Sequence, residues 1–421
     1  MTVSAERLTT GAIRSWINVV IGALLMLATL PGRTQGLGLI TEPMLKDLRL
    51  DRVTYADINL WSTLLGGAFC LPAGWLLDRY NRRWTTTLIL LLLGVVVWRI
   101  SVLTGGVAAL FILILLTRAL GQSALSVASI TVVGKSFGKR VGLAMSVYSI
   151  LISLGFATAF KLVGGEVRAQ GWRGAWREVA FALVVVVAPL TLLLLSSHSS
   201  ETARDSDSRN AADSSGVKLS DALRSPVFWI FAGAASLYGL VSSGLGLFNE
   251  AVLAERGFDQ KTYHTLLSVT TLIALVGQMF SGWLTLRWPM RRLLAAALFI
   301  YAAGLLSLPM LRTHAQLWAF AGLVGVSGGI ITVVFFAIWR QAFGALYLAR
   351  IQGAAQMLTV LASALGPLLF AKCHALTGSY FPILLGLAPA VALVGVAAWR
   401  GAATAAFPEA ASGAVSLEQA R

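Results

Sequence analysis

The chain alternates between long apolar blocks and short polar connections. Most blocks have roughly 18 to 27 residues, enough for an α-helix rising about 1.5 Å per residue to cross a hydrocarbon layer of about 30 Å. Apolar residues within the blocks do not alternate with polar ones, which favours helices over membrane strands. The pattern predicts an all-α membrane protein with twelve transmembrane helices, at residues 15–40, 56–77, 84–103, 107–133, 141–163, 179–196, 226–250, 262–286, 293–311, 315–339, 351–373 and 380–399.

The composition agrees with a chain that has lipid as its solvent. Of its 421 residues, 57% are hydrophobic and 12% are charged, and the mean hydropathy is +0.78. A net charge of +15 would point to nucleic acid in a soluble protein, but here the basic residues gather in alternate short loops. This is the positive-inside pattern, so it excludes a nucleic-acid partner and predicts that both termini are cytoplasmic. We expect an integral protein of the inner or plasma membrane.

The apolar blocks fall into two sets of six, separated by a polar, serine-rich stretch. This predicts an N-terminal half at 1–195, a cytoplasmic linker at 196–225, a C-terminal half at 226–400 and a cytoplasmic tail at 401–421. The halves also repeat a motif, since Gly74-Trp75-Leu76 recurs as Gly282-Trp283-Leu284, each followed by arginines. We therefore predict pseudo-symmetric halves with a substrate site near the membrane midplane between them.

The segment Gly74-Trp-Leu-Leu-Asp78-Arg79-Tyr-Asn-Arg82-Arg83 resembles the signature loop between the second and third helices of the major facilitator superfamily. Asn81 stands where that family usually has glycine, and we attribute this to the tolerance of asparagine for left-handed backbone. Segments 39–48 and 135–144 are loosely similar to the monocarboxylate porter and oxalate/formate branches. The resemblance implies a secondary transporter, not an enzyme, and we expect a monomer.

The signature predicts a conformational latch made of Gly74, Asp78, Arg79, Arg82 and Arg83. Asp78, at the end of the second span, can accept hydrogen bonds from the positive N-terminus of a facing helix. Such a contact would stabilise one of two access states. The alternative is that the arginines only set the topology.

Ionisable residues at membrane depth need a reason, because they are costly there. Arg118 lies near the middle of the fourth span with Gln122 one turn away, so we predict that both contact substrate. Arg33 follows Pro31-Gly32, a pair expected to loosen the first span, and it either contacts substrate or reaches the outer headgroups. The other predicted substrate contacts are Tyr148, Asn249 and Gln278, and Glu250 is the predicted proton carrier.

Arginines with few membrane carboxylates favour an anionic substrate, because guanidinium pairs with carboxylate. We predict a secondary transporter of a small organic anion, such as a monocarboxylate, driven by proton symport. An exporter of amphipathic or drug-like compounds is the alternative. A membrane-embedded enzyme or lipid scramblase would need clustered histidines or carboxylates at one interface, which the sequence lacks. No metal-ligand spacing and no nucleotide-binding loop is present, so we expect no cofactor and no metal.

Overall fold

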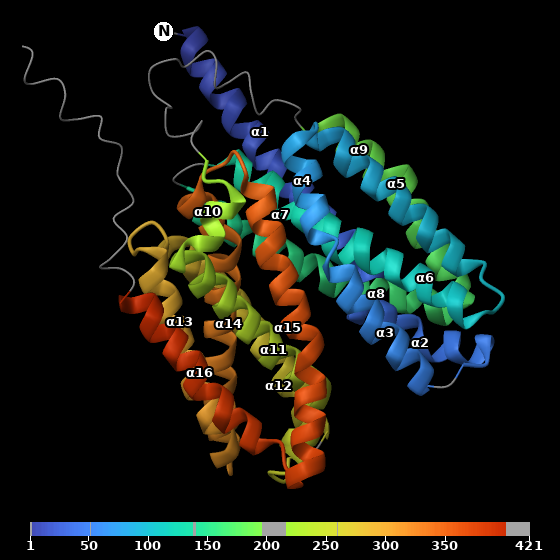
Figure 1. Cartoon of the computed structure of the whole chain (residues 1–421), viewed down its shortest axis with the longest axis vertical. Helices are drawn as coiled ribbons and strands as arrows, with labels where there is room; N and C mark the ends of the chain where they lie inside the picture. Colours follow the sequence, from blue (N-terminus) through green and yellow to red (C-terminus); the bar gives the residue numbers. More distant parts are fainter. Residues whose placement is uncertain (1, 51, 138–139, 196–215, 259, 401–421) are drawn as a thin grey trace, which may run out of the picture.

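The structure is a computed structural model that describes residues 2–50, 52–137, 140–195, 216–258 and 260–400. Nearly all of these residues are helical (Figure 1). The helices are α1 (Thr2–Leu27), α2 (Thr34–Leu48), α3 (Arg52–Gly67), α4 (Cys70–Arg79), α5 (Arg82–Ser101), α6 (Val107–Thr117), α7 (Ser126–Ser136), α8 (Val141–Phe181), α9 (Ala188–Leu194), α10 (Leu219–Arg224), α11 (Pro226–Ala254), α12 (Gln260–Leu284), α13 (Met290–Ser307), α14 (His314–Phe343), α15 (Leu348–Thr377) and α16 (Phe381–Arg400).

The number of membrane crossings agrees with the sequence pattern. Among the described residues, ten helical segments are long and apolar enough to cross a membrane. One of them, Val141–Leu194, has 54 residues and turns at Gly171, so it supplies two crossings. The shorter apolar helix Val269–Leu284 supplies another. The predicted twelve-helix fold is therefore confirmed.

Two predicted boundaries are wrong in detail. The first span is not one helix from 15 to 40, because α1 ends at Leu27 and a 3-10 turn at Leu30–Gly32 separates it from α2. The loop expected at 164–178 is helical except at Gly171, whose φ of 76° is a left-handed value that suits glycine. In both places a proline or glycine changes the backbone direction over one or two residues. Hydropathy, which is averaged over a longer window, does not detect so short a change.

The helices form two groups that lie side by side, with α1 to α9 in one group and α11 to α16 in the other (Figure 1). They come together at the end where α4 and α7 meet α15, near the start of α1, and diverge toward α2 and α3 (Figure 1). One cluster of buried apolar side chains, which includes Leu90, lies within the first group, and a second, which includes Leu298, joins the second group to parts of α1, α7 and α8.

Glycines allow close backbone contact where the two groups cross. A Cβ on Gly74 or Gly353 would collide with the backbone of the facing helix, on α15 and α4 respectively. A second crossing repeats the arrangement, since Gly142 of α8 faces Thr285 and Gly282 of α12 faces Ser146. The two copies of the Gly-Trp-Leu motif therefore lie at two equivalent helix crossings between the halves.

Candidate functional site

A cavity of about 370 Å³ lies between the two groups of helices. Helices α1, α7 and α8 and the residue after the 3-10 turn line it on one side, and α11, α14 and α15 on the other. The lining residues are Met26, Arg33, Ile130, Ile152, Ser153 and Phe156 from the first group, and Ala235, Tyr238, Gly239, Ile331, Thr332, Phe335, Phe336, Gln356 and Thr359 from the second.

Arg33 is the only charged residue in this described lining. It occupies the break between α1 and α2, with extended backbone, where Pro31 helps to interrupt the helix. Its Nε donates to Thr29 Oγ1 (2.6 Å), and its Nη2 donates to Met26 Sδ (2.8 Å) and Ser126 Oγ (3.3 Å). Among the residues that the structure describes, nothing bonds its Nη1. Thioether sulfur is a weak acceptor, so this guanidinium still has donors for a ligand.

Arg118 lies elsewhere, inside the first group of helices and 1% exposed. Its Nη1 donates to Gly32 O (3.0 Å), Thr34 Oγ1 (3.2 Å) and Gln122 Oε1 (2.8 Å), and its Nη2 donates to Asn59 Oδ1 (3.0 Å). Arg118 and Gln122 are thus in contact, as their spacing predicted. Neither residue is part of the cavity lining. The Arg118 guanidinium is bonded to protein oxygens instead.

The Arg118 contacts explain how the break in the first span is held. A broken helix leaves backbone carbonyls without intrahelical partners, and inside a membrane these must be satisfied by the protein. Arg118 satisfies the carbonyl of Gly32, which directly precedes Arg33. Residues Arg118–Leu125 are π-helical, and Gly32 packs against this segment. Arg118 therefore fixes the backbone from which Arg33 extends.

Two of the other predicted contacts, Tyr148 and Gln278, lie beside the cavity without lining it. Tyr148 is fully buried, shares a hydrogen bond with Ser129 Oγ (2.7 Å), and places its ring edge-on to Phe336 (5.3 Å). Gln278 Nε2 donates to Ser153 Oγ at 3.4 Å, and Ser153 does line the cavity. The predicted substrate contact Asn249 and the predicted proton carrier Glu250 are not placed, because their side chains lie outside what the structure describes.

Asp78 joins the two groups of helices. Its carboxylate, 2% exposed, accepts the backbone N–H groups of Ala349 (3.2 Å) and Arg350 (2.9 Å) in the first turn of α15. It also pairs with Lys135 Nζ at 2.8 Å. This is the contact with a facing helix N-terminus that the sequence predicted, and partial positive charge there stabilises the carboxylate. The sequence alone did not indicate that Lys135 and the first turn of α15 would be the partners of Asp78.

The rest of the signature segment shapes this contact. Gly74 lets α4 approach the start of α15, Arg79 lies over the Trp75 ring (5.0 Å), and Arg82 interacts electrostatically with Asp78. Arg83 donates its backbone N–H to Asn81 Oδ1 at 3.0 Å. The explanation given for Asn81 is therefore wrong, since its φ is −63° and it caps the N-terminus of α5 instead of adopting left-handed backbone.

The two crossings differ at the position of Asp78. Arg79 over Trp75 is matched by Arg287 over Trp283 (4.2 Å), 208 residues later. The same offset from Asp78 leads to Leu286, which is exposed. Among the described residues, the carboxylate contact of Asp78 at the crossing of α4 and α15 thus has no counterpart at the matching position of the second crossing.

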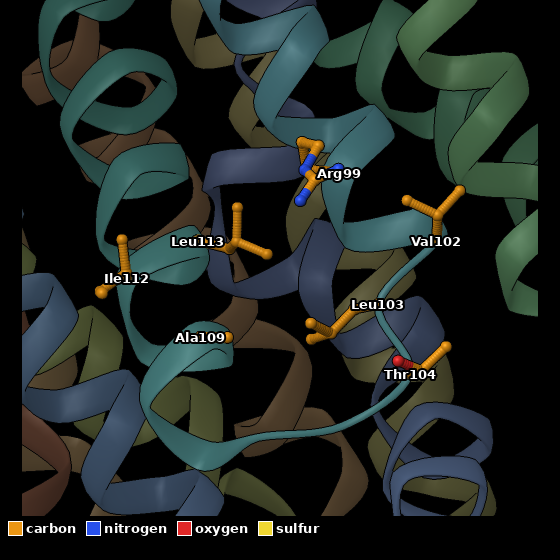
Figure 2. Close-up of a pocket in the computed structure, with 7 residues that line it drawn as sticks. All are labelled: Arg99, Val102, Leu103, Thr104, Ala109, Ile112 and Leu113. Carbon is orange, nitrogen blue, oxygen red and sulfur yellow. The ribbon is translucent and has the colours of Figure 1, made fainter.

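A second cavity, of about 340 Å³, lies within the first group alone. Figure 2 shows its lining at the end of α5, at the start of α6 and in the loop between them. It contains one charged residue, Arg99, and receives no residue from the second group. A rearrangement of the two groups relative to each other would therefore not open this cavity first to one side of the membrane and then to the other.

Several cavity residues were missed from the sequence, notably Thr332, Phe335, Phe336, Gln356 and Thr359. Gln356 carried a usable signal, since an uncharged amide within an apolar span needs a partner or a cavity. The phenylalanines gave no such signal, because a phenylalanine that faces lipid and one that faces a cavity have the same hydropathy.

The comparisons with known proteins agree with this architecture. Residues 21–367 match the model of the Major Facilitator Superfamily, and no curated protein matches the chain. Among solved structures, the human organic anion transporter MFSD10 (TETRAN) is 16% identical, with 90% of this chain and 99% of that chain covered and a TM-score of 0.70. The transporter FucP in the outward conformation is 14% identical (92% and 99% covered, TM-score 0.68). A variant of the E. coli fucose:proton symporter FucP is also 14% identical (91% and 98% covered, TM-score 0.67). At these identities the likeness shows the fold alone.

Proposed function

The chain belongs to the Major Facilitator Superfamily, and we propose that it carries a small organic anion across the membrane by alternating access. It is an integral membrane transporter and not an enzyme. The observation that supports an anion is Arg33, a half-buried guanidinium in the cavity between the two halves. The described lining holds no carboxylate to neutralise it. A buried unpaired charge is costly, so a negatively charged ligand would be bound better than a neutral or cationic one.

Alternating access requires that the halves close at one end while the cavity communicates with the other. The Asp78 contact with α15 closes the end at which the α4 and α15 backbones meet. By the distribution of basic loops this end is cytoplasmic, in the inner or plasma membrane. In our proposal the structure corresponds to a state that is closed toward the cytoplasm, and substrate enters from the opposite side.

The proposed driving force is proton symport. The described cavity lining has no carboxylate and no histidine, so a proton carrier would have to lie beside the cavity. Glu250 on α11 stays the predicted carrier, because a carboxyl near an apolar cavity can be protonated near neutral pH. A monocarboxylate remains the proposed type of anion.

The alternative function, export of amphipathic compounds, is favoured by one observation. Phe156, Phe335 and Phe336 line the cavity together with aliphatic side chains. An apolar lining of this kind would also accept neutral or cationic amphiphiles, for which Arg33 would be unnecessary.

Replacing Arg33 separates the two functions. In proteoliposomes, Arg33→Gln should lower uptake of the transported organic anion at least tenfold, whereas Arg33→Lys should retain part of it because the charge remains. Arg99→Gln is the matched control, since Arg99 belongs to the one-sided cavity of Figure 2. Unchanged anion uptake by Arg33→Gln would exclude the anion proposal, and uptake of neutral amphiphiles by all variants would favour the exporter.

A further inference from the structure

We propose that the anion is an aromatic monocarboxylate, bound with its carboxylate on Arg33 and its ring among the cavity phenylalanines. This rests on the proposed function and narrows it to one class of substrate. Three properties of the cavity carry it: a single charge, aromatic walls in both halves, and neutral polar groups in the second half.

The single charge limits the ligand to one carboxylate. Arg33 is alone among the charged residues of the described lining, and its Nη1 and weakly bonded Nη2 form one edge for a bidentate carboxylate. A dicarboxylate would place its second charge against phenylalanine, methionine or a neutral polar side chain. Its desolvation would then be uncompensated, which disfavours binding.

The aromatic walls favour a ring over an aliphatic chain. The Arg33 guanidinium lies over the Phe156 ring at 5.3 Å, so the charge and the first aromatic wall are adjacent. Phe335 and Phe336 face the cavity from the other half, with centroids 5.8 Å apart and planes at 53°. A ring placed between these walls buries apolar surface and gains aromatic contacts, which acetate or lactate cannot do. A volume of about 370 Å³ suits a small ligand.

The neutral polar groups favour a hydrogen-bonding substituent on the ring. Thr332, Gln356 and Thr359 line the cavity from the second half. Within the described part of the chain, the Gln356 side chain has no hydrogen-bond partner. A hydroxyl group on the ring could bond to it, so that the ligand is held by Arg33 in one half and by Gln356 in the other. A ligand that bridges the halves favours the arrangement in which both halves contact it.

The test measures binding of labelled benzoate to the purified transporter and its exchange in proteoliposomes. Each unlabelled competitor differs from benzoate in one property. Acetate lacks the ring, and cyclohexanecarboxylate has a ring that is not aromatic. Terephthalate has a second carboxylate, benzyl alcohol has no carboxylate, and 4-hydroxybenzoate has an additional hydroxyl group. We expect benzoate to compete at least tenfold better than acetate, terephthalate and benzyl alcohol, and 4-hydroxybenzoate to compete several-fold better than benzoate.

Two variants connect the ranking to the cavity. Phe336→Leu should reduce the preference for benzoate over cyclohexanecarboxylate, and Gln356→Leu should remove the advantage of 4-hydroxybenzoate. Phe280→Leu is the matched control, because Phe280 is exposed on α12 and is not part of the lining. Unchanged preferences in both cavity variants would overturn the inference.

The outcomes also separate this inference from the proposed function. If acetate and lactate bind and exchange as well as benzoate, with dependence on Arg33, the aromatic class is wrong and the anion transporter stands. If terephthalate is preferred, the single-charge argument is wrong. If no carboxylate binds or exchanges in the wild type, both proposals fail.

Discussion

Replacing Asp78 with asparagine tests whether the carboxylate holds the two halves together. The carboxylate accepts two backbone N–H groups at 3.2 and 2.9 Å and pairs with Lys135 at 2.8 Å, and its side chain is 2% exposed. Asparagine keeps the shape but has one acceptor oxygen, and its amide would present a donor to a site lined with donors. At least one charge-assisted contact is lost.

The size of the effect follows from that contact. A hydrogen bond to a charged group contributes about 1.5–3 kcal/mol, and about 1.4 kcal/mol changes an equilibrium tenfold. A loss of about 2 kcal/mol should therefore move the ratio of closed to open states at this end by about 30-fold. An open state that is rare in the wild type would become readily detectable.

Distances between spin labels at Trp84 and Leu346 provide the assay. Both residues are exposed near the closed end, one on α5 and one just before α15, and the native Cys70 and Cys373 are replaced by alanine beforehand. Asp78→Asn should add a population with a longer distance. Asp47→Asn is the control, because Asp47 contacts only Trp172 and Arg173 of its own half among the described residues. Identical distributions in Asp78→Asn and the wild type would reduce the signature segment to a topology signal.

Two further predictions concern closure and coupling. Gly353→Val should open the same end, because a side chain there collides with the α4 backbone. Gly386→Val is the control and should not open it, because a Cβ at Gly386 meets open space. Equal label distances in both variants would contradict the argument that close helix packing holds this end closed. Glu250→Gln should leave anion exchange intact and abolish accumulation driven by a pH gradient; retained accumulation would mean that another group carries the proton.

Hydropathy predicted the twelve crossings, because apolar length determines whether a helix can cross the membrane. The segment that resembles the signature loop predicted that Asp78, at the end of a span, contacts the N-terminus of a facing helix. The pair Pro31-Gly32 was itself expected to loosen the first span, and α1 and α2 are separated there. These signals lie in a few adjacent residues.

The identity of the cavity arginine could not be predicted in this way. An ideal helix would fix the direction of Arg118 from its position in the span, but Arg118–Leu125 is π-helical and so has a different register. The direction of Arg33 depends on the backbone at the break, which is set by packing against that π-helical segment. The directions of both arginine side chains depend on contacts between spans, and these contacts cannot be inferred from a single sequence.

The contrast between these two arginines gives the last prediction. Arg118 donates from two guanidinium nitrogens to four oxygens, and lysine offers one nitrogen that cannot reach all of them. Arg118→Lys should leave the Gly32 carbonyl or the Asn59 oxygen unsatisfied and lower the stability of the ligand-free protein by about 1–3 kcal/mol. Arg33 donates to only two oxygens, Thr29 Oγ1 and Ser126 Oγ, and both hydroxyls also donate hydrogen bonds of their own, so Arg33→Lys should weaken anion binding with a smaller loss of ligand-free stability. Thermal unfolding of both variants, each with and without the transported anion, distinguishes the roles. If Arg118→Lys unfolds like the wild type but loses anion binding, then Arg118 contacts the substrate directly and the positioning role is wrong.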